Sequence, residues 1–396
     1  MSVQTAVAAE ALLTTSAFRE ALRLAAEHAD DVDRKSRFPA EAIHALKAAG
    51  ALGCYVPQEL GGMGISFPDL AEVTFEISRR CTATGMVFAM HQIQVGSIVR
   101  HFGGSGWFEN YLRRVAAEQR LIASVTSEVG VGGEMRRSVA AIAPVENSSH
   151  QVQFEKQAST ISYGGHADDL LTTTRRHAGA EGSDQVLVLT HVDQTEMKQT
   201  SDWDTLGMRG TCSPGFVIRA TCLAEQVMSV PFSTIAAETV VPFSHILWAH
   251  VWMGTASDAF DRAQNFVRMQ ARQNPGTTPP AALRLSELCA HMAQFRALVR
   301  ASTDEYNGFL EGENRQQLST IGYAVRINNL KISASEAAAE ACQSALRVTG
   351  ILGYKNGTPY SVGRHLRDSL SGALMVANDR IHSTNAALLL VYRGGK

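Results

Sequence analysis

The chain has 396 residues and a formal net charge of −2, and 45% of its residues are hydrophobic while 19% are charged. A charge this close to zero excludes a protein that is drawn to nucleic acid or anionic membranes by general electrostatics. The hydrophobic share is typical of a globular protein with a substantial core, and the length allows two or three domains.

The six cysteines include no C-x-x-C pair, so the sequence predicts neither a zinc site nor a disulfide framework. The N-terminal stretch 1–22 lacks a basic start followed by a long apolar run. No stretch reaches the roughly 18 apolar residues that span a bilayer. We therefore expect a cytoplasmic protein without a bound metal.

The first part of the chain, residues 16 to about 120, predicts helices. Phe18, Leu22 and Ala25 recur at helical spacing, and Ser16 precedes them as a candidate N-cap. These residues predict an amphipathic helix at the start of a helical domain.

Further helices follow in the same region. Pro39 suits a helical first turn, and Gly50 is placed to end that helix. Residues 79–95 form an apolar stretch that predicts a buried helix, and His91 lies within it. A histidine in such surroundings is either a core residue with satisfied hydrogen bonds or a polar group that faces a site.

From about 121 to 240 the pattern changes to short β-rich runs separated by Gly, Ser, Asn and Asp. The runs are LIASVTSE, HQVQFEKQAST, DQVLVLTHV and GFVIRATCLAEQVMSV. From about 241 the helical pattern returns, with long helices predicted up to residue 273, over 284–309 and over 321–348.

Two stretches carry a family resemblance. Residues 38–64 and RHLRDSLSGALMVANDRI at 364–381 resemble segments of the acyl-CoA dehydrogenases, as do four shorter blocks between them. The resemblance implies a mainly α fold with an inserted β-domain: an N-terminal helical domain (1–120), a central β-barrel domain (121–240) and a C-terminal four-helix bundle (241–396).

The same resemblance points to a missing catalytic base. In the family the segment at 364–381 carries a Glu-Gly-Thr sequence whose Glu removes the substrate α-proton. Those positions fall on Val376, Ala377 and Asn378. The family's second place for a base falls on Ser244 and His245, ten residues before Gly254. His245 is a candidate base because the pKa of an unperturbed imidazole is near 6.5, and a structural role is the alternative.

Two blocks in the β-domain resemble the family's flavin contacts. The loop at 124–134 supplies four candidate cofactor residues, and glycines there let backbone N–H groups approach a phosphate or ring closely. Ser162 falls on the hydroxyl position that contacts flavin N5, and Thr160 replaces the family's aromatic shield. The loop candidates are Thr126, Ser127, Gly132 and Gly133.

Further candidates come from the C-terminal domain. Arg272 matches the family arginine that reaches the FAD pyrophosphate of a neighbouring subunit, and a guanidinium fork suits paired phosphates. Gly350 matches a family glycine, while Arg347 and Ile351 replace Gln and Gly. FAD is the expected cofactor, and FMN is the alternative.

Three functions remain open. The first is α,β-dehydrogenation of an acyl thioester with hydride transfer to the flavin, with an electron-transfer flavoprotein as partner. The second is a monooxygenase or N-hydroxylase that uses reduced flavin from a partner reductase, with His91, Ser162 and Asn378 around the flavin. The third is a non-catalytic flavin-binding relative. The candidate catalytic residues are thus His91, His245 and Asn378, and the family resemblance implies a homotetramer or dimer.

Overall fold

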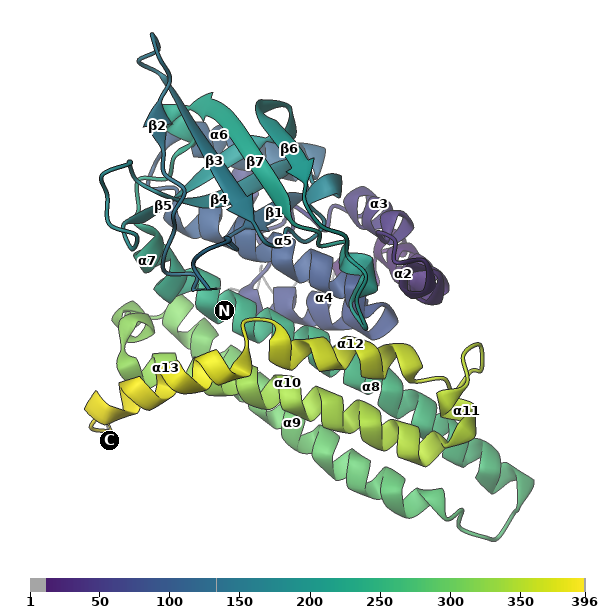
Figure 1. Ribbon diagram of the computed structural model, residues 1–396. Coiled ribbons are helices and arrows are strands. Elements are labelled where there is room, and N and C mark those ends of the chain that lie inside the picture. The colour runs from purple at the N-terminus through teal and green to yellow at the C-terminus, as the bar shows by residue number, and fades with distance from the viewer. Residues whose placement is uncertain (1–11, 133, 395–396) are drawn as a thin grey trace.

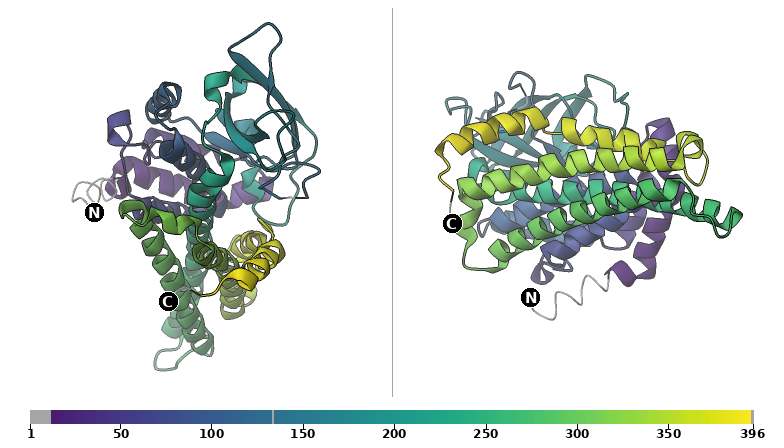
Figure 2. Two further views of the ribbon diagram at one scale, coloured as in Figure 1. Left: turned by 90° about the vertical axis from the view of Figure 1, so that its left-hand side faces the viewer. Right: turned by 90° about the horizontal axis from the view of Figure 1, so that it is seen from below.

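The computed structural model describes residues 12–132 and 134–394, and it shows a β-rich region above two layers of helices (Figures 1 and 2). Within residues 12–120 the N-terminal layer has five α-helices: α2 (Ser16–Lys35), α3 (Ala40–Ala48), α4 (Phe67–Arg80), α5 (Thr82–His101) and α6 (Gly106–Glu118).

The helix ends show how local sequence sets this layer. Thr15, and not Ser16, is the N-cap of α2, because its side chain accepts a hydrogen bond from the Phe18 backbone N–H. The predicted Ser16 cap is therefore wrong by one residue. Gly50 follows α3 with a φ of 73°, which confirms that it ends this helix in a left-handed conformation. Cys81 separates α4 from α5, so the predicted helix over 79–95 is two helices.

The central region contains seven strands in two sheets. One sheet has the order β1-β4-β5, and the other has the order β2-β3-β7-β6. The central β-region that the resemblance implied is thus confirmed, and its strands pair in two sheets. Their bounds are β1 (Ile122–Val125), β2 (Ala143–Pro144), β3 (Gln151–Ala158), β4 (Asp169–Arg175), β5 (Gln185–His191), β6 (Thr195–Gln199) and β7 (Phe216–Leu223).

The C-terminal layer is a bundle of long helices (Figure 2). A short π-helical turn at Ala236–Val240 leads into its first member. The short helix α7 (Phe232–Ile235) precedes that turn. The bundle comprises α8 (Val241–Gln273), α9 (Ala281–Glu311), α10 (Ile321–Thr349), α11 (Ile351–Tyr354), α12 (Gly363–Leu374) and α13 (Asn378–Val391). The predicted order of helices, β-region and helices is confirmed, whereas the division into domains at 120 and 240 stays a prediction.

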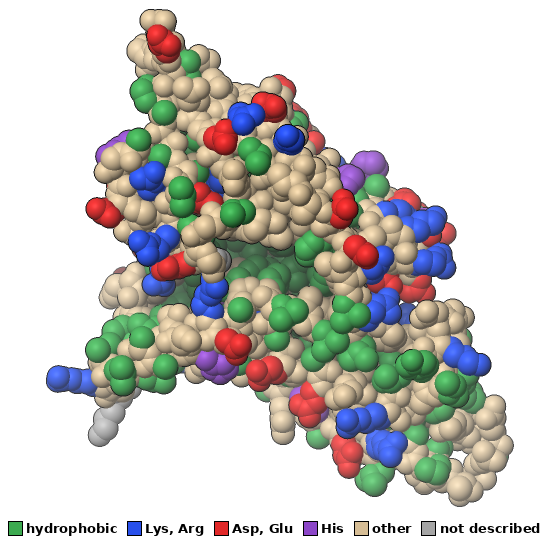
Figure 3. Space-filling view, viewed as in Figure 1, with side chains coloured by type: hydrophobic (Ala, Val, Ile, Leu, Met, Phe, Trp, Pro, Cys, Tyr) green, Lys and Arg blue, Asp and Glu red, His purple; other side chains and the backbone are tan. Residues whose placement is uncertain are grey.

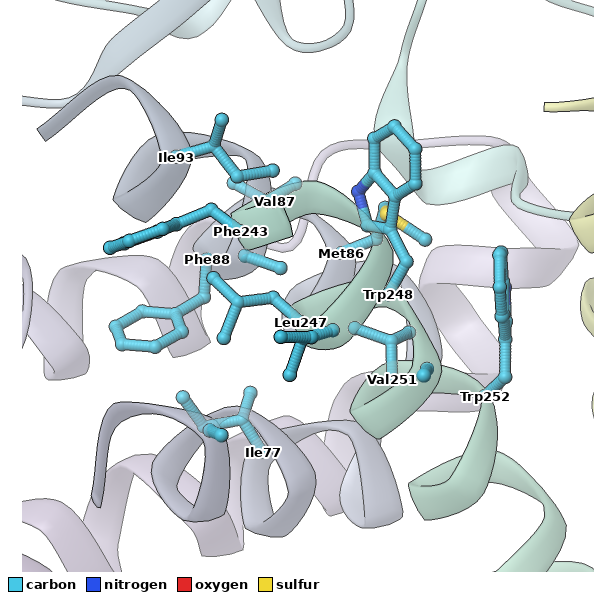
Figure 4. Close-up of a cluster of buried hydrophobic side chains, with 14 of the residues drawn as sticks. Ile77, Met86, Val87, Phe88, Ile93, Phe243, Leu247, Trp248, Val251 and Trp252 are labelled. Atoms are coloured by element: carbon cyan, nitrogen blue, oxygen red, sulfur yellow. The ribbon is translucent and has the colours of Figure 1, made fainter. Parts of the chain in front are cut away.

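The main core joins the N-terminal helices to the first bundle helix. Phe243 of α8 packs directly against α5, because a Cβ at Gly96 would lie only 2.5 Å from the Phe243 ring. Figure 4 shows Phe243, Leu247 and Trp248 projecting from α8 among apolar side chains of α4 and α5. This contact fixes α8 beneath the β-region, where the candidate site lies. None of the described helices is long and apolar enough to cross a lipid bilayer.

Candidate functional site

A hollow lies between the β-region and the last two helices. Figure 3 shows it with hydrophobic side chains on its floor, between the β-strands above and α12 and α13 below. The Arg380 guanidinium of α13 donates a hydrogen bond to the Gly132 carbonyl and so connects the two sides. The hollow is thus bounded by parts of the chain that the sequence analysis singled out separately.

Ser162 of the β-region has a half-buried hydroxyl that is paired with a second hydroxyl. The Ser213 hydroxyl donates to Ser162 Oγ over 2.9 Å, and Ser213 is only 2% exposed. Ser213 has one hydroxyl proton, and its Oγ also lies 2.9 Å from Thr211 Oγ1. Where that proton is donated to Ser162, the proton of Ser162 is available for another acceptor. This arrangement fits a hydroxyl that donates to a ring nitrogen of a bound group.

The backbone around Ser162 is held in an unusual conformation. Tyr163, Met208 and Cys212 have φ values of 45°, 52° and 42°, in the left-handed region that non-glycine residues rarely adopt. The Tyr163 N–H donates to the Thr211 carbonyl over 2.7 Å and ties the segment to the 209–211 turn. Such clustered strain is typical of functional sites and persists only where the surroundings enforce it.

The loop after β1 is anchored by a buried carboxylate. Glu128, 5% exposed, accepts hydrogen bonds from the backbone N–H groups of Val139 and Ala140 at 3.0 and 2.7 Å. Lys156, whose pKa burial lowers to about 8, lies 3.5 Å from the Glu128 carboxylate. Glu128 therefore stabilises the loop and is not available to a ligand.

The predicted flavin residues of this loop lie on its open side. The Ser127 hydroxyl donates to the Thr160 carbonyl over 2.6 Å, and the Thr160 N–H donates back to Ser127 over 3.1 Å. Gly132 has a φ of 59° and open space where a Cβ would stand, and Thr126 is half-buried. Gly133 lies outside the residues that the structure describes. The structure thus brings together the candidates from the two β-domain blocks.

The conserved-looking start of the 364–381 segment docks α12 on both other regions. Arg364 is buried and pairs with Asp30 of α2 over 3.1 Å. The Asp368 carboxylate accepts a hydrogen bond of 2.7 Å from the Met208 N–H, in the turn that carries Ser213. Burial raises the pKa of Asp368 to about 6 although Arg364 opposes the shift. These contacts set the distance between α12 and the part of the β-region that carries the hydroxyls of Ser162 and Ser213, which we call the hydroxyl wall.

Neither family base position offers a proton acceptor of suitable strength. Val376 lies in the turn between α12 and α13 with a φ of 50°, and its side chain is apolar. Ser244 is 4% exposed and donates to the Val241 carbonyl over 2.9 Å. A neutral serine has no basicity near pH 7, so both positions lack the carboxylate chemistry of an α-proton base.

The two candidate histidines are buried in the core. His91 is fully buried, accepts from the Ile122 N–H through Nδ1 at 3.0 Å, and contacts the Leu52 carbonyl through Nε2 at 2.9 Å. Its two nitrogens are therefore engaged by backbone groups. His245 is 4% exposed, and its Nδ1 donates to the Ile327 carbonyl of α10 over 3.1 Å. Burial lowers the pKa of each imidazole to about 4, so the geometry favours the structural alternative for both.

Asn378 is engaged inside the bundle. It is 8% exposed, its Oδ1 accepts from the Lys331 ammonium over 2.7 Å, and its Nδ2 donates to Ser335 over 3.1 Å. A direct flavin contact by this amide would require these bonds to break.

The C-terminal cofactor candidates lie away from the hollow, at the outer end of the bundle near α11 (Figure 1). Arg272 lines an open cavity of about 420 Å³ together with Arg268 and Tyr360. Arg347 and Gly350 stand at the nearby end of α10, where Gly350 has a φ of 58°. Within one chain the structure does not bring this group together with Ser162.

Three residues of the site were not singled out as functional from the sequence. Ser213 had a signal, since it fell in a matched block, but its hydrogen bond to Ser162 depends on three-dimensional pairing. Lys331 and Trp248 gave no signal, because a lysine or tryptophan in an amphipathic helix is indistinguishable from an ordinary face residue. Trp248 is 8% exposed, and its Nε1–H has no hydrogen-bond partner among the described residues.

Comparison with known proteins identifies both helical parts. Residues 9–119 match the family description "Acyl-CoA dehydrogenase, N-terminal domain", and residues 235–383 match "Acyl-CoA dehydrogenase, C-terminal domain". The probable acyl-CoA dehydrogenase YngJ of Bacillus subtilis is 23% identical over 356 residues, which cover 87% of this chain and 88% of the relative.

Other similar proteins are oxygenases. A dibenzothiophene monooxygenase of Rhodococcus erythropolis is 24% identical over 252 residues, which cover 57% of this chain and 55% of the relative. The crystal structure of FMN-bound TdsC from Paenibacillus sp. A11-2 superposes with a TM-score of 0.81 at 19% identity, covering 96% of this chain and 98% of that one. Similar proteins therefore divide between dehydrogenases and flavin-dependent monooxygenases.

Proposed function

Because the chain belongs to the acyl-CoA dehydrogenase family of flavin-dependent oxidoreductases, we propose that it is a flavin-dependent monooxygenase that takes reduced flavin from a partner reductase. One observation carries this choice. The hydroxyl wall that suits a flavin is present, whereas Val376 and Ser244 occupy both family base positions. Loss of a positioned base forfeits about 10²–10⁴-fold in rate for α-proton removal, but oxygen insertion does not begin with that step.

The residues of the hollow fit a flavin ring. Ser162 has a hydroxyl proton free to donate, and Ser213 behind it fixes the direction of that hydroxyl. Gly132 leaves open space beside the loop. A bound reduced flavin supplies the two electrons that reduce one oxygen atom of O₂ to water while the other enters the substrate. The chain itself holds and shields the ring, and orients the substrate.

The floor of the hollow suits a small, largely apolar substrate. Figure 3 shows hydrophobic side chains along this floor. Apolar side chains favour a ligand that has apolar surface to bury. We propose that the substrate lies against this surface, opposite the hydroxyl wall.

We propose a homotetramer, with a dimer as the alternative, in which the outer bundle end of one subunit completes the flavin site of another. The separation of Arg272 from Ser162 within one chain supports this arrangement. Exposed apolar side chains on α12 and α13 support it as well, since monomers rarely expose such clusters. They are Leu370 (43% exposed), Leu374 (79%), Leu389 (54%) and Leu390 (88%). Native mass spectrometry of the flavin-loaded protein tests the stoichiometry, and a flavin-bound monomer would contradict it.

FAD remains the cofactor that the Arg272 cavity supports, because only FAD carries a second phosphate and an adenine to fill it. FMN is the alternative, and titration with each flavin decides between them. FAD should bind more tightly than FMN, and Arg272→Ala should weaken FAD binding alone. Equal affinities for the two flavins would mean that the protein recognises only the FMN part of FAD.

The decisive experiment compares two reactions of the flavin-loaded protein. We expect reduced protein to react with oxygen in more than one phase in rapid-mixing absorbance, at a rate different from free reduced flavin. We also expect oxidised protein to keep its visible flavin band when it is mixed with short- and medium-chain acyl-CoA without oxygen. Bleaching by acyl-CoA would overturn the monooxygenase assignment.

Acyl-thioester dehydrogenation is the second candidate, favoured by the match to YngJ across 87% of the chain. It would require a base other than the residues at the two family positions, and bleaching by acyl-CoA would support it. Absence of binding by either flavin would contradict both enzyme functions and leave a non-catalytic relative.

A further inference from the structure

A lysine ammonium is buried beneath the turn between α12 and α13. Lys331 of α10 has no exposed surface. Its Nζ donates to the Gly372 carbonyl over 2.9 Å and to Asn378 Oδ1 over 2.7 Å. The ammonium also lies 5.9 Å from the centre of the Trp252 ring, a cation–π distance. No carboxylate of the described residues lies within ion-pair distance of it, and the proposed reaction does not use it.

The ammonium lies where the break between α12 and α13 leaves backbone carbonyl groups without partners. The last carbonyl groups of a helix have no partners within the helix, and a cation near them is favourable. Gly372 belongs to the last turn of α12, and Asn378 is the first residue of α13. Lys331 therefore binds the end of one helix and the start of the next, across the turn that contains Val376.

The turn itself is strained. Val376 has a φ of 50°, and the next residue, Ala377, has a φ of −5°. A β-branched residue in the left-handed region is costly, and it persists only where the surrounding structure enforces it. The contacts of Lys331 on both sides of the turn provide that enforcement.

The helices α8, α10 and α12 pack closely around Gly372. A Cβ at Gly372 would lie 3.0 Å from Ser335 Cβ and 3.1 Å from the Trp252 ring. The amide of Asn378 is fixed from its other side by Ser335 at 3.1 Å. The cluster is thus a fitted set of contacts, and a side chain of another shape at residue 331 would displace the turn.

We propose that Lys331 is a positioning residue that holds the turn 375–378 as the lower rim of the flavin hollow. It touches neither flavin nor substrate and acts through Val376 and through Arg380, whose guanidinium reaches the Gly132 carbonyl of the flavin loop. The inference rests on the proposed function in one respect, namely that the hollow binds a flavin.

The test compares Lys331→Met with a matched control on the same two helices. Asn385 of α13 is 6% exposed, and its Nδ2 donates to Asn329 of α10 over 2.9 Å, away from the turn. Both Lys331→Met and Asn385→Leu should lower the thermal midpoint. Lys331→Met alone should weaken flavin binding, by about fivefold, because the rim that Arg380 joins to the flavin loop would move; flavin fluorescence quenching measures this.

A spectroscopic readout separates positioning from general destabilisation. At saturating flavin the visible band of the Lys331→Met complex should shift and lose fine structure, because the rim beside the ring has moved. The Asn385→Leu complex should keep the wild-type spectrum. If Lys331→Met does not fold, Lys331→Gln retains an N–H donor, and it should show a smaller loss of affinity than a variant without one.

The outcomes are distinguishable from those of the functional proposal. If the wild-type protein binds no flavin, the proposed function fails and this inference fails with it. If the wild-type protein binds flavin and Lys331→Met and Lys331→Gln bind it equally well with the same spectrum, only the role of Lys331 is overturned.

Discussion

The two sides of the hollow differ in which of the family's functional groups they carry. The β-region wall carries hydroxyl groups, a glycine-containing loop and strained left-handed residues around Ser162, all of which suit the binding of a flavin. The helical side has Val376 and Ser244 at the two family base positions, and burial lowers the pKa of its histidines His91 and His245. Under the proposed function, this difference means that cofactor binding and proton abstraction are separable in this fold, because they depend on different elements of the chain.

The largest expected effect is a fall in the free energy of unfolding in acid, caused by buried histidines of the helices. His91 and His101 of α5 and His245 and His250 of α8 each have a pKa that burial lowers to about 4, against about 6.5 in an unfolded chain. Between these values the unfolded state binds more protons, so the free energy of unfolding rises with pH from 4 to 6.5 and is full above 6.5. Each histidine contributes at most about 3 kcal/mol of this change.

We therefore expect acid to unfold the helical layers while the β-region changes later. Circular dichroism at the helical bands between pH 7 and pH 4 measures the unfolding of the helices. Hydrogen exchange of β3 and β7 measures the opening of the β-region. Simultaneous loss of both at one pH would show that the two regions form one cooperative unit.

The next effect tests how closely the two walls are joined. A Cβ at Gly207 would meet the Arg367 carbonyl and lie 2.7 Å from the Asp368 backbone nitrogen, so α12 packs directly on this glycine. Gly207→Val should destabilise the protein by about 3 kcal/mol through overpacking and weaken flavin binding. Gly165→Val is the control, because it has open space where a Cβ would stand. Unchanged denaturant midpoints for Gly207→Val would contradict this packing.

A third variant tests the helical wall for a hidden base. His245→Leu leaves the Ile327 carbonyl without its donor, which should cost about 1–3 kcal/mol of stability, while turnover per folded molecule stays unchanged. His250→Leu is the matched control, since His250 is also buried on α8 but donates within its own helix to the Ile246 carbonyl over 2.9 Å. A loss of turnover specific to His245→Leu would restore this histidine as a base.

The order of regions and most helix bounds were predictable because they depend on local pattern. The spacing of Phe18, Leu22 and Ala25 and the position of Gly50 each predicted a structure that was confirmed. Strand β4 was missed because its sequence lacks the alternation of apolar and polar residues, since it is buried along nearly its whole length between β1 and β5.

The flavin roles of Ser162 and the 126–132 loop stay predictions, and they depend mainly on the adjacent turns. The Ser127–Thr160 hydrogen bonds bring these two segments together. The roles of His91 and Asn378 depend on which distant backbone or side chain occupies their hydrogen bonds. Leu52 and Ile122 engage His91, and Lys331 engages Asn378, and no sequence spacing encodes those partners.

A smaller effect tests the hydroxyl wall directly. Ser162→Ala removes the proton that is free to donate, and the loss of one hydrogen bond of about 1 kcal/mol corresponds to roughly a five- to tenfold weaker flavin affinity. Ser159→Ala is the control, because Ser159 is exposed and lies outside the predicted flavin contacts. Equal flavin dissociation constants for Ser162→Ala and wild type, by fluorescence titration, would remove Ser162 from the cofactor site.

The smallest effect tests whether the strain in the helical wall has a function. Val376→Gly relieves a φ of 50° and should raise the free energy of unfolding by about 1 kcal/mol, with Val376→Ala in between because it removes only the β-branch. A turn without strain also loses its fixed shape, so we expect Val376→Gly to bind flavin more weakly although it is more stable. Thermal unfolding and flavin titration of the same samples measure both quantities. If stability and affinity rise together, the strain at Val376 does not contribute to flavin binding. If stability rises while affinity falls, the strained turn shapes the flavin site at the position where the family has its base.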